Sequence, residues 1–392
     1  MLRVPQADLV RARLAVAVVF FVNGLVLASW LPHIPAVKAA HGISDGELGL
    51  VLLGMAVGAM LALPVAGFLV ARFGSRRMTS AAAIALCLAL PLPLVAPRVL
   101  VLGTSLVLLG AANATLDVSM NAQAVAVEAG YGRAIMSSFH GLFSLGGLVG
   151  AALAGGAMAA GMGDVAHVAL MAAASLAAVL GCLPFLLPSP PAFARPGPVF
   201  VRPRGALLAL GALAFCGLIA EGAMGDWSAV YLHDTLGSSP ALASAGFAAC
   251  SLAMAAGRFT GDRLVGRYGA ERVLRMSSAV AAIGLAAALV VGTPASGVLG
   301  FGLVGLGIAN VIPILFSAAG RIPGTEAGVA LAAVAATGYF GFLVGPPLIG
   351  MVADVTGLRV ALGIVAGLCG VIAVGAGAMD PPAGTADSRA VA

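Results

Sequence analysis

The chain has 392 residues, of which 61% are hydrophobic and 9% carry a charged side chain. Soluble domains have about 25% charged residues, so this composition excludes a surface that is covered by water. The net charge of +5 does not indicate a nucleic-acid partner, because the basic residues are spread over the predicted loops. We therefore expect an integral membrane protein that binds no nucleic acid.

The apolar residues fall in runs that are long enough to cross a hydrocarbon core about 30 Å thick. Backbone groups in lipid must be satisfied within their own segment, so these runs are predicted to be helices. The first run continues past Trp30 without a cleavage site, which favours a retained helix over a signal peptide. Ser44 and Glu47 form a capping box for the second helix, and Ser239 before Pro240 is an N-cap for the eighth. The predicted helices occupy residues 14–32, 48–70, 79–96, 99–120, 136–160, 165–187, 206–227, 241–262, 273–292, 297–318, 328–350 and 358–378.

The distribution of basic residues predicts the orientation. With the N-terminus in the cytoplasm, sixteen arginines fall on the cytoplasmic side, and Lys38, Arg98 and Arg359 fall on the other. This asymmetry follows the positive-inside rule and predicts an inner-membrane protein with both termini in the cytoplasm. Six prolines and three arginines between residues 188 and 204 predict a linker. The expected organisation is a six-helix bundle over residues 1–187, a cytoplasmic linker over 188–204, a second bundle over 205–379 and a cytoplasmic tail over 380–392.

An internal repeat relates the two halves. The basic stretch at residues 67–77, after the second helix, recurs 195 residues later at 262–272. Asn23-Gly24 is echoed by Glu221-Gly222, and Ala112-Asn113 by Ala309-Asn310. These landmarks predict the duplication of a six-helix unit, with both copies in the same orientation because six is an even number.

The two basic turns and the 6+6 layout resemble the major facilitator superfamily. The strings at residues 113–121, 138–144, 221–228 and 338–347 are similar to its MosC-like or YbjJ-like branch, which is related to fucose-permease-like sugar transporters. The resemblance implies two all-α bundles around a central cavity, lined by helices one, four, seven and ten, with alternating access. Two features depart from the pattern. Ala71 replaces the usual acidic residue of the basic turn, and helix four lacks the arginine that is common in drug–proton antiporters.

Ionisable side chains inside a membrane cost roughly 2.5 kcal/mol or more, so they are expected to face a cavity or a partner. Glu221 is expected to be a substrate ligand or proton site, or a hydrogen-bonding link between helices one and seven. Asp117 and His140 lie at matching depths, which predicts a proton-sensitive or substrate-binding pair. The alternative is that Asp117 accepts from Arg72 or Arg133 and tethers a loop.

Other polar groups have two interpretations each. Arg258 and Asp262 are spaced to pair within one helix, and Trp30 and Trp227 are expected to anchor helix ends at the membrane surface. The glycines of residues 146–150 predict helix packing rather than a phosphate loop, and all five cysteines are expected to be buried and inert. Four asparagines can bind a polar solute or hold helices together: Asn23, Asn113, Asn121 and Asn310. The gating candidates are Arg72, Arg76, Arg77, Asp262, Arg263 and Arg267.

These features predict a secondary transporter that moves a small, polar, largely neutral solute such as a sugar or polyol across the inner membrane. We expect no enzymatic activity, cofactor or metal, because no P-loop, nucleophile–base set or metal-ligand spacing is present. Protons are a candidate coupling ion, and a monomer is expected. The alternatives are efflux of amphipathic compounds and a non-transporting membrane sensor.

Overall fold

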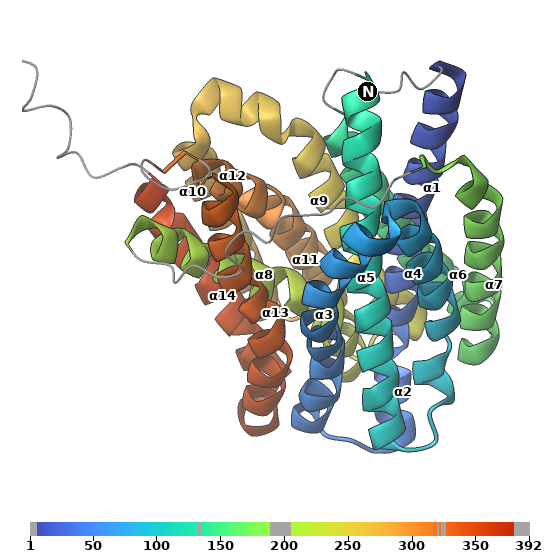
Figure 1. Ribbon diagram of the computed structural model, residues 1–392. Coiled ribbons are helices and arrows are strands. Elements are labelled where there is room, and N and C mark those ends of the chain that lie inside the picture. Colours follow the sequence, from blue (N-terminus) through green and yellow to red (C-terminus); the bar gives the residue numbers. More distant parts are fainter. Residues whose placement is uncertain (1–5, 132–134, 189–204, 320, 323–326, 380–392) are drawn as a thin grey trace, which may run out of the picture.

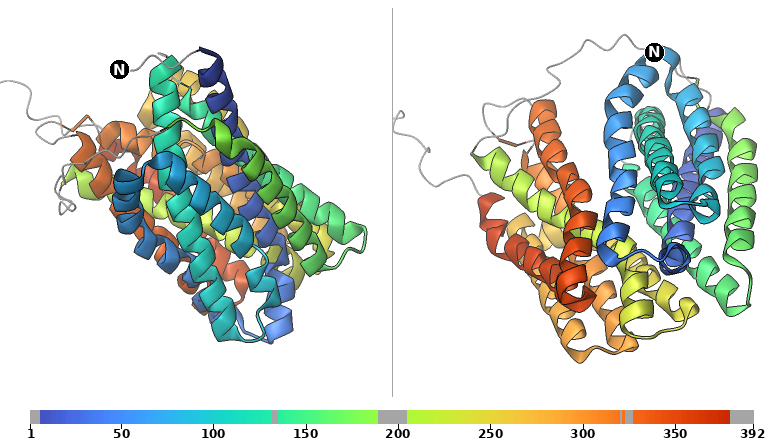
Figure 2. Two further views of the ribbon diagram at one scale, coloured as in Figure 1. Left: turned by 45° about the vertical axis from the view of Figure 1, so that its right-hand side comes forward. Right: turned by 90° about the horizontal axis from the view of Figure 1, so that it is seen from below.

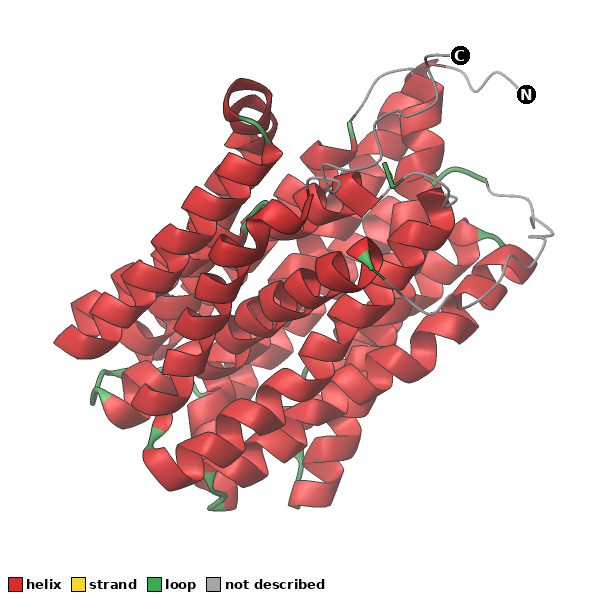
Figure 3. Cartoon of the chain, turned by 90° about the vertical axis from the view of Figure 1, so that its left-hand side faces the viewer, coloured by secondary structure: helices red, strands yellow, loops and turns green. Residues whose placement is uncertain are grey.

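The computed structural model describes residues 6–131, 135–188, 205–319, 321–322 and 327–379 (Figure 1). Every regular element in these ranges is helical (Figure 3). Twelve helical segments are long and apolar enough to cross a membrane, which confirms the predicted all-α fold class. In chain order, the helices are α1 (Gln6–Trp30), η1 (Leu31–His33), α2 (Ile34–His41), α3 (Asp45–Phe73), α4 (Ser75–Ala89), η2 (Leu92–Val95), α5 (Val99–Tyr131), α6 (Met136–Ala159), α7 (Asp164–Cys182), η3 (Leu183–Phe185), α8 (Ala206–Val230), η4 (Tyr231–Thr235), α9 (Pro240–Tyr268), α10 (Ala270–Val291), α11 (Pro294–Ile308), α12 (Val311–Ala319), α13 (Ala327–Thr356), α14 (Leu358–Gly375) and η5 (Ala376–Met379).

The helix starts agree with the predicted caps. The Ser44 hydroxyl accepts from the Glu47 amide at 3.1 Å, and the Glu47 carboxylate accepts from the Ser44 amide at 2.9 Å. The Ser239 hydroxyl accepts from the amide of Leu242 at 3.3 Å, and Leu242 is the third residue of the turn that Pro240 begins. Both N-terminal signals are therefore confirmed.

Several spans run past their predicted ends, and one is broken. The fourth, predicted to end at residue 120, continues to Tyr131 as α5. The first does not end at residue 32, because α1 continues through η1 and α2 as far as His41. The tenth is broken at Ala309 and Asn310, between α11 and α12. Pro313 has no backbone N–H to donate to the carbonyl of Ala309, which explains a break at this point.

The predicted role of the two tryptophans is wrong. Trp30 is 1% exposed and Trp227 is 0% exposed, so both lie in the core rather than at a membrane surface. The physical reason is that neither residue ends its span. The chain continues as η1 and α2 after Trp30, and as the last turn of α8 and the π-helical turn η4 after Trp227.

The helices form two groups that lie side by side (Figure 2). One contains α1 to α7 and the other contains α8 to α14, and the main contacts between them are α6 with α9 and α3 with α13. We call the end of the molecule that carries α2 the Lys38 end; α2 is at the lower edge of Figure 1. The opposite end carries the turns α3–α4 and α9–α10, and we call it the basic-turn end.

The repeat is visible in the backbone of these two turns. Gly74 has φ 84° and ψ 149°, and Gly269, which lies 195 residues later, has φ 83° and ψ 151°. Positive φ strains other residues, so glycine is needed at both positions. Arg72 lies over the ring of Phe73 at 5.6 Å, and Arg267 lies over the ring of Tyr268 at 5.2 Å.

Equivalent glycines also allow equivalent helices to pack closely. A Cβ on Gly110 would lie 2.0 Å from the carbonyl oxygen of Met55, and a Cβ on Gly305 would lie 2.2 Å from that of Cys250. In the same way, a Cβ on Gly146 would lie 2.0 Å from the carbonyl oxygen of Phe21. The predicted packing role of the glycine-rich segment is confirmed at this position.

This packing corrects two details of the predicted repeat. Because Gly110 corresponds to Gly305, 195 residues later, Asn113 corresponds to Ile308 and not to Asn310. A Cβ on Gly341 would lie 2.5 Å from the carbonyl oxygen of Phe215, which matches the contact of Gly146 with Phe21. Phe215 lies 194 residues after Phe21. At this offset Glu221 corresponds to Leu27 and not to Asn23, so the acidic group lies about one helical turn further along its helix than the amide does.

Replacing Gly146 with alanine is expected to lower the melting temperature of the purified protein. The added methyl group must push α6 away from α1, and overpacking of this kind costs about 1–3 kcal/mol. Gly156 is a matched control on the same helix, because a Cβ there would meet nothing within 4 Å. Gly156→Ala should leave the melting temperature unchanged or raise it slightly. Equal melting temperatures for the two variants would contradict the close packing.

Candidate functional site

An ion pair lies at the boundary between the two groups of helices. Arg258 on α9 places Nη2 3.5 Å from Oε1 of Glu221 on α8. The same guanidinium donates through Nη1 to the hydroxyl of Ser144 on α6, at 3.2 Å. The two charged side chains are 24% and 30% exposed, so both are mostly shielded. Arg258 therefore links the second group of helices to the first.

The expected partner of Arg258 was Asp262. The side chain of Asp262 lies outside the described part of the structure, so that pairing is not tested. The contacts with Glu221 and Ser144 give Arg258 partners that sequence spacing does not suggest, since they come from two other helices.

His140 lies one turn before Ser144 on α6. Its ring is 5.3 Å from the ring of Phe20 on α1, in an edge-on arrangement. The hydroxyl of Ser144 also donates to the carbonyl oxygen of His140, at 3.3 Å. Arg258 is close enough to act electrostatically on His140. The histidine thus belongs to the surroundings of the ion pair.

Asp117 does not pair with His140 as predicted. Its carboxylate accepts from the Asn121 amide at 3.0 Å, and its backbone carbonyl accepts from the same amide at 2.9 Å. Both residues lie on α5, one turn apart, so this local bond competes with a bond between helices. Of the two arginines suggested as tethers, Arg72 stacks on its neighbouring ring, and Arg133 lies outside the described residues.

The asparagines divide into two kinds. Asn310 is 8% exposed and donates to the carbonyl oxygen of Gly257 at 2.9 Å, which makes it a link between helices. Asn23 donates to the sulfur of Met120 at 3.7 Å, and its side-chain oxygen is buried without a partner among the described residues. The side-chain oxygen of Asn113 is in the same state. Buried polar atoms are rarely left unpaired, so these two oxygens are candidates to accept from a polar ligand.

Two residues of the site were missed by sequence reasoning. Ser144 lies in the string at 138–144 that suggested the family, one turn after His140, but a serine in an apolar run gave no signal of its own. Tyr339 on α13 is close enough for both Asp117 and Glu221 to act on it electrostatically. It lies in the string at 338–347, which indicated the resemblance to the family but gave Tyr339 no role of its own.

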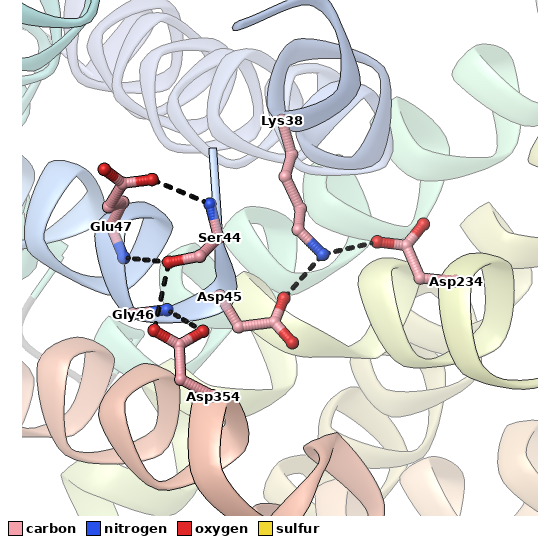
Figure 4. Close-up of polar contacts among 7 residues, drawn as sticks. All are labelled: Lys38, Ser44, Asp45, Gly46, Glu47, Asp234 and Asp354. Atoms are coloured by element: carbon pink, nitrogen blue, oxygen red, sulfur yellow. Dashed lines mark hydrogen bonds and ion pairs between the residues drawn. The ribbon is translucent and has the colours of Figure 1, made fainter. Parts of the chain in front are cut away.

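A charged cluster joins the two groups at the Lys38 end (Figure 4). The amine of Lys38 on α2 lies 2.6 Å from Oδ1 of Asp45 on α3 and 2.8 Å from Oδ2 of Asp234 in η4. Asp45 belongs to the first group of helices and Asp234 to the second. Lys38 therefore bridges carboxylates from both groups.

Asp354 makes a second connection at this end. Its carboxylate accepts from the hydroxyl of Ser44 at 3.0 Å and from the backbone amide of Gly46 at 2.8 Å, so α13 caps the start of α3 (Figure 4). A carboxylate is favoured there by the free N–H groups and the helix dipole. A Cβ on Gly46 would lie 2.2 Å from the Asp354 carboxylate, so a larger residue at this position would displace that carboxylate from the start of α3. We call Lys38, Asp45, Asp234 and Asp354 the latch.

No such connection is present among the described residues of the basic-turn end. Arg76 donates to the carbonyl oxygen of Pro184 at 3.0 Å, within its own group of helices. Arg77 and Arg263 are exposed. Neither these arginines nor Arg72 and Arg267 pair with a described residue of the other group. The structure is thus held closed at the Lys38 end.

The described residues contain no group of three or more His, Cys, Asp or Glu side chains that could hold a metal ion. The five cysteines are buried and unpaired, as predicted.

The described residues form twelve helices that can span a membrane, in two related groups, with an ion pair where the groups meet and a latch at one end. This arrangement is that of a polytopic membrane transporter. The sequence profile of the Major Facilitator Superfamily matches residues 16–323 and 209–390. The chain belongs to that superfamily.

Curated relatives share much of the sequence. An uncharacterised MFS-type transporter of Yersinia pestis is 40% identical over 92% of this chain and 94% of its own length. The membrane protein MosC of Rhizobium meliloti is 38% identical over 89% of this chain and 85% of its own length. Both relatives cover nearly the whole chain, so the likeness extends over both groups of helices.

Solved structures share the fold. A crystal structure of a mutant form of the nucleoside transporter NupG superposes with a TM-score of 0.79 over 94% of this chain and 100% of its own, at 15% identity. The human organic anion transporter MFSD10 superposes with a TM-score of 0.66 over 95% of this chain and 99% of its own, at 17% identity. At these identities the likeness concerns the fold alone.

Proposed function

We propose that this protein is a secondary transporter of a small, polar, largely neutral solute of the sugar or polyol kind. The observation that carries the proposal is the Glu221–Arg258 ion pair with its link to Ser144, placed where the two groups of helices meet. A solute bound there touches both groups and is positioned to respond when they move.

The composition of the cluster favours a neutral ligand. The charge of Arg258 is compensated by Glu221, so an anionic solute would have to displace an existing partner, which is costly in a shielded site. Hydroxyl groups can instead accept from the guanidinium, and the unpaired oxygens of Asn23 and Asn113 on the first group of helices are further candidate acceptors for a solute that touches both groups. Nucleosides are also neutral and rich in hydroxyls, and NupG is a nucleoside transporter, so they belong in the same panel of candidates.

We propose further that the chain belongs to the MosC-like branch, a placement favoured by the 38% identity to MosC. Transport proceeds by alternating access, with residues 1–187 and 205–379 rocking about the site. In the opposite state Arg72 and Arg267 close the basic-turn end. The protein acts as a monomer in the inner membrane, with protons as the candidate coupling ion.

The orientation is part of the proposal. The basic-turn end, both termini, the linker at 188–204 and the tail at 380–392 face the cytoplasm, on the strength of the arginine distribution. Residues 189–204 of the linker and the whole of the tail lie outside the described residues. A membrane-impermeant thiol reagent should label a cysteine at Thr235 from outside intact cells, and labelling only after the cells are opened would overturn the orientation.

Ligand-dependent thermal stabilisation tests the substrate class. A ligand that binds only the folded state stabilises it by RT ln(1 + [L]/Kd), about 2.7 kcal/mol at a hundredfold excess over Kd. We expect at least one sugar, polyol or nucleoside to raise the melting temperature of the purified protein in a saturable manner. Stabilisation by amphipathic drugs alone would instead support efflux of such compounds and contradict a hydroxyl-rich substrate.

A further inference from the structure

Two histidines and an aspartate form a hydrogen-bonded chain at the Lys38 end, away from the central ion pair. His33 in η1 contacts the carboxylate of Asp164 through Nδ1 at 3.0 Å and Nδ1 of His167 through Nε2 at 2.9 Å. His33 is 0% exposed and His167 is 3% exposed, whereas the Asp164 side chain is 41% exposed. The chain therefore runs from a solvent-accessible carboxylate to a buried imidazole.

The His167 end of this hydrogen-bonded chain has no partner in the described part of the structure. Nε2 of His167 is buried and has no hydrogen-bond partner among the described residues. A structural tether alone does not require a second buried imidazole with a free nitrogen, since unpaired buried polar atoms are costly. Such a group is better accounted for by a change in its protonation.

The protons can be counted from the bonds. The Asp164 carboxylate only accepts, so Nδ1 of His33 donates to it. When both rings are neutral, Nε2 of His33 accepts from Nδ1–H of His167, and the group has a net charge of −1. One added proton makes His33 a donor at both nitrogens and moves the His167 proton to Nε2, which keeps both hydrogen bonds and brings the net charge to zero. A second added proton leaves two donors facing each other across the 2.9 Å contact, and that bond must break.

The broken bond would act on the latch. His33 immediately precedes α2, which carries Lys38, and His167 belongs to α7, so the bond between them ties the start of α2 to α7. The short η1 segment also packs against α8 and α9 of the other group of helices. Release of η1 would free α2 and, with it, the cation that bridges Asp45 and Asp234.

We propose that Asp164, His33 and His167 form a proton-binding site, separate from the central cluster, through which acidification on the Lys38 side opens the latch. The site takes one proton without structural change and a second that cuts the tether between η1 and α7. The ligand is the proton, and its effect is on the fraction of molecules that are open at the Lys38 end.

Other titratable or charged groups lie on the elements around this site. The other histidines are the main alternative source of a pH response, because the pKa of a free histidine is about 6.5 and that of a free carboxyl group is about 4. His41 on α2 contacts the carbonyl oxygens of Val37 and Ala96, and His233 in η4 contacts that of Ser238. The third histidine is His140 on α6, an element that packs against both η1 and α7. Charged groups on or near the packed elements also include Lys38 on α2, Asp45 and Glu47 on α3, Arg98 before α5, Glu221 and Asp226 on α8, Asp234 in η4 and Arg258 on α9.

The test measures the distance between spin labels on cysteines at Ala40 in α2 and Thr235 in η4, in the full-length protein. We expect the separated population to rise several-fold as the pH falls from about 8 to about 4.5. Free histidines change charge between about pH 5 and pH 8, and the second proton on a buried, closely spaced pair needs a lower pH than that. His167→Asn keeps an amide donor near the position of Nδ1 but cannot titrate, so it should stay closed throughout. His167→Gln provides a second non-titrating variant.

His41→Gln and His233→Gln are the matched controls, and both should keep the wild-type response. The proposal is overturned if the wild-type distance does not depend on pH. It is also overturned if both His167 variants respond as the wild type does, or if His41→Gln or His233→Gln abolishes the response.

Discussion

Replacement of Lys38 with methionine is expected to open the Lys38 end of the molecule. Methionine keeps an unbranched side chain of similar length but removes the only cation of the latch. Asp45 and Asp234, which approach from opposite groups of helices, then lose their shared partner. A third carboxylate, that of Asp354, is close by, because it is bonded to Ser44 and Gly46 on either side of Asp45. Repulsion between these carboxylates favours separation of the groups.

The size of the effect follows from the two ion pairs. The three side chains are 16% to 32% exposed, and each partly exposed pair contributes up to about 1 kcal/mol. A loss of about 1–2 kcal/mol changes a two-state ratio by roughly 5–30-fold. Distance measurements between labels at Ala40 and Thr235 should show this shift at neutral pH.

Arg98→Met is the matched control. Arg98 is an exposed basic residue in the α4–α5 connection, at the same end of the molecule, and its loss changes the local net charge by the same amount. The control should leave the distance distribution unchanged. An unchanged distance distribution in Lys38→Met would show that the latch does not hold the two groups together. If Arg98→Met opened the molecule equally, the loss of one positive charge at this end, rather than the latch, would explain the opening.

The second large effect is expected at Glu221. Glu221→Gln keeps the shape of the side chain and most of its hydrogen bonding, but it cannot take up or release a proton. If Glu221 couples transport to protons, the variant should lose accumulation driven by a pH gradient and should retain exchange of solute across the membrane. The physical reason is that protonation of Glu221 removes the negative charge that holds Arg258, and the glutamine leaves Arg258 released at every pH.

Two acidic residues serve as comparisons for this variant. Asp226→Asn makes the same chemical change five positions further along α8, and it should leave accumulation intact. Asp117→Asn tests the alternative coupling site on α5. Unchanged accumulation in Glu221→Gln at normal expression would eliminate Glu221, and loss in Asp117→Asn alone would move the coupling site to Asp117.

The fold could be predicted from the sequence because lipid leaves few alternatives. A run of apolar residues must form a helix, and the duplicated basic turn fixed how the halves correspond at the basic-turn end. Local errors arose where the signal depends on packing. The offset between helices one and seven is 194, one residue less than the 195 that relates the two basic turns, and only the contacts of Gly146 with Phe21 and Gly341 with Phe215 reveal it.

The candidate site was predicted less completely. Glu221, His140 and Asn23 were singled out because polar side chains in apolar runs are conspicuous, but the residues that they contact come from distant helices. The link from Arg258 to Ser144 spans 114 positions, and the bond from His33 to His167 spans 134. Spacing along one helix suggested local pairs instead, such as Arg258 with Asp262. The latch escaped notice because Lys38, Asp234 and Asp354 looked like ordinary loop charges.

The central claim is that a solute binds at the Glu221–Arg258 pair and is carried across the membrane. Solute counterflow tests it directly, with proteoliposomes that are loaded with an unlabelled solute from the stabilising panel and diluted into the labelled one. The wild type should accumulate label transiently, Arg258→Gln should not, and Arg272→Gln, which removes an exposed arginine of α10 that has no part in the site or the gate, should behave as the wild type. Counterflow that persists in Arg258→Gln at wild-type rates would contradict the account.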